Sequence, residues 1–124
     1  MIKAAGFFTA MAAAAVLVAA IPSAAPAANS NDGNWSVTII TQAGNCPSSL
    51  RYGVRVVGGR VLADGQSYQV NGSVAPNGAT RVTVSEQGQS ASGTGRLSGN
   101  TGAGRWRTST GQCSGQWTAA RRNY

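Results

Sequence analysis

From Trp35 almost to the end of the chain, apolar and polar residues alternate with a period of two. Alternation of this kind predicts β-strands with one buried face, because successive side chains on a strand point to opposite sides. No stretch has helical periodicity, and glycine or proline interrupts every window in which a helix could form. The pattern therefore predicts an all-β domain.

Short turn motifs divide this alternating region into eight strands. Two-residue hairpin turns are predicted at Gly58-Gly59, Gln87-Gly88, Gly99-Asn100 and Thr110-Gly111. At Asn77-Gly78 a two-residue turn would set Val74 opposite Arg81 and mix the two faces. A three-residue loop with Gly78 in the left-handed region forms a G1 bulge and sets Val74 opposite Thr80 instead, which matches the apolar pattern. The expected topology is an eight-stranded antiparallel up-and-down meander.

The chain has two cysteines, Cys46 after the first predicted strand and Cys113 at the start of the eighth. In an exported chain we expect them to form a disulfide, which would stabilise the domain by about 4 kcal/mol in the chain-entropy model. These two positions become neighbours if the first and last strands pair, and eight strands suffice to close a small barrel. A closed, disulfide-stapled barrel is the expected fold, and an open curved sheet or a sandwich is the alternative.

The predicted register also assigns an interior. It places Trp106 between Gly93 and Gly115, and it places Trp117 across from Gly104. Large rings set against glycines fill a small barrel without overpacking it. The aromatic residues expected inside are Trp35, Tyr52, Tyr68, Trp106 and Trp117.

The first 27 residues differ in composition from the rest. Lys3 precedes an apolar stretch from Ala4 to Ile21, and small residues follow it as far as Ala25-Pro26-Ala27. This order is typical of a cleavable signal peptide, and the apolar stretch is short for a helix that spans a bilayer. We expect a signal peptide over 1–27, a flexible tether over 28–34 and one small β domain over 35–124. The processed protein would have no membrane span and would lie in the periplasm or outside the cell.

The residue types argue against catalysis. The chain has no histidine, and its acidic residues are Asp32, Asp64 and Glu86, which the predicted turns place apart from one another. General acid–base chemistry needs a histidine or a tuned pair of carboxylates, and a metal site needs more ligands than these. We therefore expect a non-enzyme with no cofactor and no metal.

The net charge of +7 comes mainly from arginines. Those that alternate with the apolar set, and so should point outward, are Arg55, Arg81, Arg96, Arg105 and Arg107. Arg121 and Arg122 add a basic tail. Outward arginines keep a Gly/Ser-rich surface soluble, and they can also contact an anionic partner such as an envelope polymer. Nucleic acid is disfavoured as the partner, because no exposed aromatic residues are interleaved with the arginines.

Three stretches carry a resemblance: Trp35-Ser36-Val37, the run from Ala91-Ser92-Gly93 to Leu97-Ser98-Gly99, and the run from Cys113-Ser114-Gly115 to Ala119-Ala120-Arg121. With these the chain resembles a group of uncharacterised small exported bacterial all-β proteins, sometimes labelled as exoproteins of haem utilisation or adhesion. The resemblance implies no activity and transfers no residue role. The region after residue 27 also lacks the His and Met residues that ligate haem iron.

Three functions remain open at this level. The first is an exported binding or inhibitory module, or an envelope-associated one, that acts through the arginine-rich outer face and contacts an anionic polymer or a protein. The second is a carrier that holds a small ligand inside the barrel, and the third is a structural protein of the cell envelope. A cavity inside the barrel would favour the carrier, and a filled interior would count against it.

Overall fold

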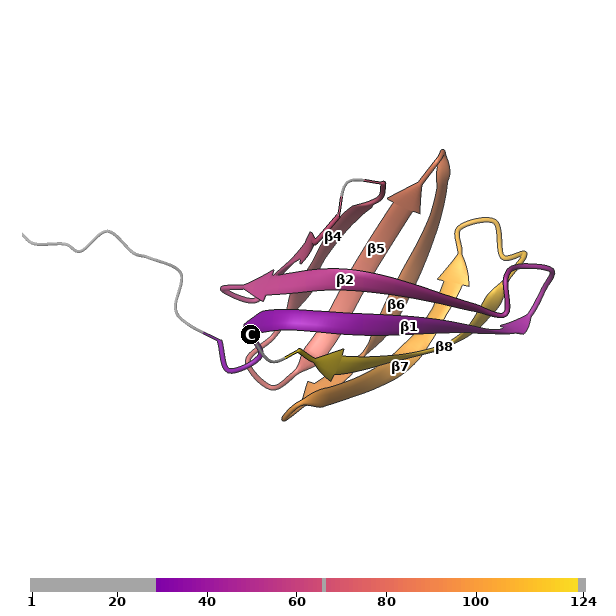
Figure 1. Cartoon of the computed structure of the whole chain (residues 1–124). Coiled ribbons are helices and arrows are strands. Elements are labelled where there is room, and N and C mark those ends of the chain that lie inside the picture. Colours follow the sequence, from indigo (N-terminus) through magenta and orange to yellow (C-terminus); the bar gives the residue numbers. More distant parts are fainter. Residues whose placement is uncertain (1–28, 66, 123–124) are drawn as a thin grey trace, which may run out of the picture.

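The computed structural model describes residues 29–65 and 67–122, so the expected signal peptide lies outside the described residues. Within these ranges the chain forms eight antiparallel strands and no helix (Figure 1). The strands are β1 (Gly33–Ala43), β2 (Ser49–Val57), β3 (Arg60–Ala63), β4 (Gln69–Val74), β5 (Ala79–Glu86), β6 (Gln89–Ser98), β7 (Thr101–Thr108) and β8 (Ser114–Arg121). In this part of the chain, no segment forms an apolar helix long enough to cross a membrane.

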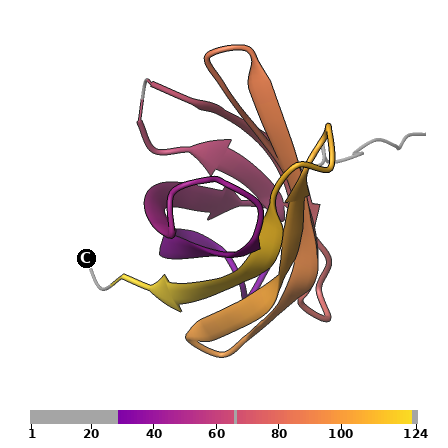
Figure 2. The same ribbon diagram turned by 90° about the vertical axis from the view of Figure 1, so that its right-hand side faces the viewer.

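Pairing between the first and last strands closes the sheet into a barrel. β1 and β8 run antiparallel from Trp35 opposite Arg121 to Ala43 opposite Ser114. Figure 2, seen from the end at which β1 and β2 are joined, shows the strands arranged around one interior. The disulfide between Cys46 and Cys113 is also present, with 6.2 Å between the two Cα atoms. The predicted closed barrel is thereby confirmed, and the open sheet and the sandwich are excluded.

The turns adopt the conformations that their sequences favour. Gly58 and Gly59 have φ values of 57° and 80°, as a two-residue turn between twisted strands requires. Gly78 has a φ of 92°, and Val74 pairs with Thr80. The G1-bulge register is therefore confirmed, together with the inward orientation that it gives to the apolar residues of β4 and β5.

Pairing is least extensive between β3 and β4. Only Arg60–Ser73 and Val61–Gly72 are paired there, whereas β5 and β6 pair from Ala79–Arg96 to Glu86–Gln89. The seam between β3 and β4 is therefore the least hydrogen-bonded part of the wall.

The tryptophans lie inside, and the predicted pairings of Trp106 with Gly93 and Gly115 and of Trp117 with Gly104 are confirmed. The ring that covers the wall formed by Gly93, Gly95 and Gly104 is that of Trp117. A Cβ on Gly95 or Gly104 would lie 2.6 Å from the Trp117 ring, and one on Gly93 would lie 3.2 Å from its Nε1. A Cβ on Gly115 would instead meet the backbone carbonyl of Ile40. β1 approaches β8 closely at this point, next to a register shift in β1. Gly115 therefore makes room for a neighbouring strand rather than for the Trp106 ring.

The segment before β1 packs against the barrel. Of the residues for which we predict a flexible tether (28–34), Gly33 and Asn34 belong to β1, and 29–32 lie across one end of the barrel. Asn31 is buried there, and its side chain donates a hydrogen bond to the carbonyl of Ala75 after β4. We call residues 29–32 the plug; residue 28 lies outside the described residues.

Candidate functional site

The barrel interior contains a cavity of about 230 Å³. Its walls are mostly aliphatic and aromatic side chains that point inward from all eight strands; β3 contributes Val61 alone and β4 contributes Val74 alone. All three tryptophans of the chain contribute. The apolar lining consists of Trp35, Val37, Ile39, Leu50, Val54, Val56, Val61, Val74, Val82, Val84, Ala91, Leu97, Trp106, Trp117 and Ala119.

One end of this cavity is closed by Trp35, and the plug lies behind that ring. Trp35 forms the floor with 1% of its surface exposed, and its Nε1 donates a hydrogen bond of 2.9 Å to the carbonyl of Asn31. The side chain of Asn29 donates to the carbonyl of Val74, and that of Asn31 donates to the carbonyl of Ala75. The plug is therefore fixed to both β1 and the β4–β5 turn.

Asp32 fastens the plug to a third point. Its carboxylate accepts hydrogen bonds of 2.8 and 3.1 Å from the backbone N–H groups of Gly58 and Gly59 in the β2–β3 turn. Burial by itself would raise the pKa of Asp32, but these backbone hydrogen bonds, one from Asn29 and the charge of Arg121 together lower it. The ionised form is thus the one that the closed end stabilises.

Arg121 holds the plug from the opposite side. It was expected in a basic tail, yet it lies on β8 with its guanidinium 4.6 Å from the centroid of the Trp35 ring. The same group donates hydrogen bonds to the carbonyls of Ser30, Asp32 and Gly99. Arg121 therefore has a structural position at the closed end of the barrel.

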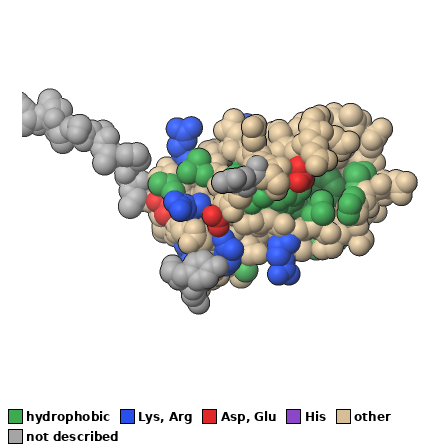
Figure 3. Space-filling model, turned by 45° about the horizontal axis from the view of Figure 1, so that its top comes forward, with side chains coloured by type: hydrophobic (Ala, Val, Ile, Leu, Met, Phe, Trp, Pro, Cys, Tyr) green, Lys and Arg blue, Asp and Glu red, His purple; other side chains and the backbone are tan. Residues whose placement is uncertain are grey.

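The other end of the cavity is open, and we call it the mouth. Its rim comes from the β1–β2 connection and from the adjacent ends of β2, β5, β6 and β7. Leu50 on β2 has 41% of its surface exposed there. Figure 3 shows hydrophobic side chains reaching the surface in a band toward this end, with an acidic group beside them.

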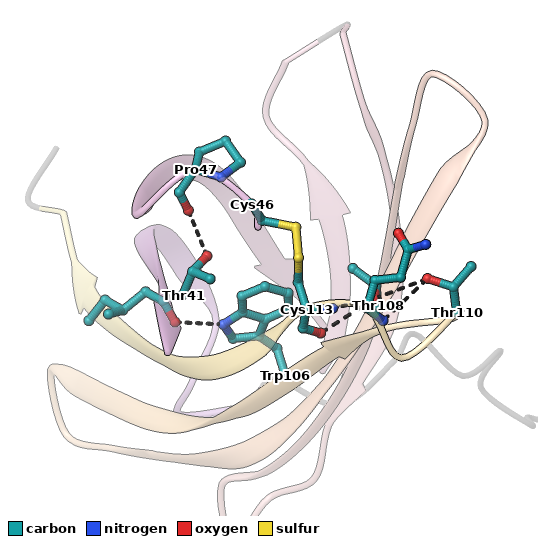
Figure 4. Close-up of a disulfide and its surroundings, with 9 residues drawn as sticks. Thr41, Cys46, Pro47, Trp106, Thr108, Thr110 and Cys113 are labelled. Carbon is teal, nitrogen blue, oxygen red and sulfur yellow. Dashed lines mark hydrogen bonds between the residues drawn. A yellow bond between two sulfur atoms is a disulfide. The ribbon is translucent and has the colours of Figure 1, made fainter. Parts of the chain in front are cut away.

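The disulfide shapes one side of the mouth. Cys46 lines the cavity from the β1–β2 connection and is bonded to Cys113, which has 2% of its surface exposed (Figure 4). Thr41 near the end of β1 donates to the carbonyl of Pro47 in this connection, and Trp106 donates to the carbonyl of Ile40. These bonds hold the rim in one position relative to the tryptophan below it.

A polar pair faces the cavity near the mouth. The hydroxyl of Tyr52 on β2 donates a hydrogen bond of 3.2 Å to the carboxylate of Glu86 on β5. Burial and the nearby negative charge of Glu86 raise the pKa of Tyr52 above its ordinary value of 10.0. The mouth therefore offers one carboxylate and one phenol above an apolar interior.

Tyr68, which was also expected inside, lies just before β4. Its ring meets that of Tyr52 edge to face with 4.9 Å between centroids, and its hydroxyl donates to the carbonyl of Gly53. It thus packs behind Tyr52 beside the poorly paired β3–β4 seam. The other four predicted interior aromatic residues, Trp35, Tyr52, Trp106 and Trp117, all line the cavity.

All five predicted outward arginines are exposed, but they do not form one group. Arg55 lies on β2, where it pairs with Asn34 and Leu62. The remaining four lie together on the outer face of β5, β6 and β7, namely Arg81, Arg96, Arg105 and Arg107.

The described residues contain no group of three or more His, Cys, Asp and Glu side chains that could hold a metal ion. The acidic residues are separated as expected: Asp32 is at the closed end, Asp64 pairs with Arg122 at 2.7 Å, and Glu86 is at the mouth. Sequence reasoning missed the partners of Asp32 and Glu86. Both side chains point toward residues of distant strands or turns, and local alternation carries no signal for such contacts.

The cavity has an apolar body and a polar rim beside its mouth, which is the usual construction of a site for a small molecule. No model of a known protein family matches the chain, and no curated protein sequence matches it. The two features of the described residues that could bind a partner are the cavity and the exposed arginines on β5, β6 and β7.

Proposed function

We propose that this chain is an exported, non-enzymatic binding protein that holds a small apolar molecule, or the apolar end of a larger one, inside its barrel. The observation that carries the proposal is the apolar cavity of about 230 Å³ with one open end. An apolar cavity of about 150 Å³ is already large enough to bind benzene, so this interior can hold one ring system or a short acyl chain.

The closed end supports this proposal because it makes the interior a pocket instead of a channel. Trp35 and the plug block one end. Asn29 and Asn31 donate hydrogen bonds to the carbonyls of Val74 and Ala75, and Asp32 accepts one from Gly58 in the β2–β3 turn, so the block is held in place. A ligand therefore enters and leaves through the mouth. A largely preformed pocket binds without a large cost for ordering the protein.

The mouth suggests how the ligand is oriented. Glu86 and Tyr52 are the ionisable groups beside the opening, and a hydrogen-bond donor or a positive charge on the ligand would find its partner there. The ligand class that fits is an apolar molecule with one donor group, which would lie at the rim while the apolar part fills the interior.

Export is part of the proposal for two reasons. The first 27 residues have the layout of a signal peptide, and the disulfide between Cys46 and Cys113 is of a kind that persists in oxidising compartments. Of the three functions that the sequence leaves open, we favour the carrier, because the barrel contains an apolar cavity. The same features agree with the group of exported bacterial proteins that the chain resembles.

Tryptophan fluorescence can test the proposal directly, because all three tryptophans of the chain line the cavity. Titration with N-phenyl-1-naphthylamine, a neutral apolar dye with one N–H donor, should quench this emission in a saturable way. An Ala91→Phe variant, which places a ring inside the wall, should weaken dye binding about tenfold or more, since a ring in place of a methyl group fills much of the space.

The matched control is Thr118→Phe, which adds the same ring to the exposed face of β8. This variant should bind the dye as the unaltered protein does. Melting both variants checks that each remains folded. Absence of saturable binding, or equal loss in the two variants, would contradict uptake into the barrel and would favour the structural envelope protein.

A further inference from the structure

Four arginines form a compact group on the outer face of β5, β6 and β7. Arg81 and Arg105 lie on either side of Thr94 in one row across the strands, which places their Cα atoms about 10 Å apart. Arg96 is the diagonal neighbour of both, at about 7–8 Å, and Arg107 follows Arg105 two residues along β7. We call these four residues the arginine face.

This face carries positive charge that the described part of the chain does not neutralise. The ion pair found among the described residues joins Arg122 to Asp64, and Asp32 and Glu86 have partners at the closed end and the mouth. Like charges on neighbouring strands repel one another and destabilise a sheet. An anionic partner would relieve this repulsion.

The surface between the arginines consists of small hydroxyl residues. Thr94 stands between Arg81 and Arg105, and the adjacent row runs from Thr83 through Ser92 to Arg107. These residues are exposed on strands, so their hydroxyl groups are presented in regular rows beside the guanidinium groups. Such a surface can bind carboxylates through the arginines and sugar hydroxyls through threonine and serine.

We propose that the arginine face binds an extended acidic polysaccharide. The exposed large hydrophobic residues of the described chain are Ile40, Leu50, Val57 and Leu62, all of which belong to β1, β2 and β3. The arginine face thus has no apolar residue to insert into a membrane and no aromatic residue on which a nucleic-acid base could stack. This site is on the outer wall and is independent of the cavity.

The test uses polygalacturonate, a linear carboxylated polysaccharide, with the full processed protein in isothermal titration calorimetry. The unaltered protein should bind it, and the affinity should fall as salt is added, because charged contacts are screened. The double variant Arg81→Gln/Arg105→Gln should bind about tenfold more weakly or worse, since it removes two charge-assisted contacts from the centre of the face.

The double variant Arg51→Gln/Arg55→Gln is the matched control. It removes the same charge from exposed positions on β2, away from β5 to β7, and should retain binding within about twofold. Equal loss in the two double variants would show unspecific attraction to net charge and would overturn the proposal. Failure to bind polygalacturonate would overturn it as well, as would tighter binding of duplex DNA or phosphatidylglycerol vesicles that depends on Arg81 and Arg105. Dye uptake into the cavity should be unchanged in both variants, so the two proposals can fail separately.

Discussion

The indole Nε1 of Trp35 donates a 2.9 Å hydrogen bond to the backbone carbonyl of Asn31, four residues earlier in the chain. The bond fixes the ring that floors the cavity to the segment that closes the barrel. The guanidinium of Arg121 lies over the same ring, 4.6 Å from its centroid. The position of the Trp35 ring at the floor of the pocket therefore depends on the plug, which precedes β1. A substitution in the plug should alter the shape of the cavity.

Replacing Asp32 by asparagine should lower the free energy of unfolding by about 1–3 kcal/mol at neutral pH, because two hydrogen bonds to a charged group are weakened. The folded-state pKa of Asp32 is below its ordinary value of 3.8. The stabilisation is therefore present above that value and is lost as the pH falls through the folded-state pKa. Urea melts at a series of pH values should show the variant and the unaltered protein converging in acid.

Asp64→Asn provides the comparison for that experiment. Its ion pair with Arg122 is partly exposed to solvent, and ion pairs at the surface contribute about 0–1 kcal/mol. A loss from Asp64→Asn as large as that from Asp32→Asn would mean that the plug does not depend on the Asp32 contacts.

Loss of the disulfide through Cys113→Ser should destabilise the protein by about 2–5 kcal/mol. The bond joins positions 67 residues apart and fixes one side of the mouth to the start of β8. Denaturant melts under oxidising conditions give the measurement. The reduced, unaltered protein should melt close to the variant, and detection of two free thiols in the purified native protein would refute the bond.

Trp106→Ala should cost about 3–5 kcal/mol, because the ring is 8% exposed and its removal enlarges the cavity. It also removes the hydrogen bond to the carbonyl of Ile40. The neighbouring change Arg105→Ser should stay within about 0.5 kcal/mol, since that side chain is exposed on the outer face. The reverse ranking in denaturant melts would mean that β7 has the opposite orientation.

Alanine at two glycines of the wall should have different effects. At Gly104 a Cβ would lie 2.6 Å from the Trp117 ring and would also collide with the backbone carbonyl of Thr94, so we expect a loss of about 1–3 kcal/mol. At Gly93 the nearest atoms are 3.2 Å away, and small shifts can accommodate the methyl group. Thermal melts should therefore place Gly93→Ala close to the unaltered protein, and similar losses at both sites would contradict the placement of the Trp117 ring.

The phenol of Tyr52 should ionise above its ordinary pKa of 10.0, and Glu86→Gln should bring its pKa back toward that value. Because the pKa of Tyr52 is raised in the folded state, the neutral phenol contributes to the free energy of unfolding below the unfolded-state pKa. This contribution is lost as the pH rises through the folded-state pKa. Ultraviolet titration of phenolate absorbance measures the shift, with Tyr52→Phe identifying the signal. An unchanged titration in Glu86→Gln would mean that the carboxylate does not act on the phenol.

The strand register could be predicted because each turn has a local chemical requirement. Gly78 permits the left-handed conformation of the bulge, and that one residue sets Val74 opposite Thr80 and keeps the apolar face continuous. Pairing of Cys46 with Cys113 then specified which strands close the barrel.

The plug and the cavity could not be predicted in the same way. A polar run such as Asn29 to Asp32 has the composition of a loop, and its partners are backbone groups of turns that are distant in sequence. Empty volume depends on how far the rings of Trp106 and Trp117 extend across the barrel. Alternation states which side chains point inward and says nothing about the space they leave.

Closure of the barrel through β1 and β8 has a consequence for the order of folding. The first strand pairs on one side with the last, so a growing or emerging chain lacks that partner until residue 121 is available. Contacts of such long sequence separation form late and make folding slow. The chain should therefore remain unfolded while it is being synthesised, or while it crosses a membrane in the export that we propose, and become compact only after β8 is released.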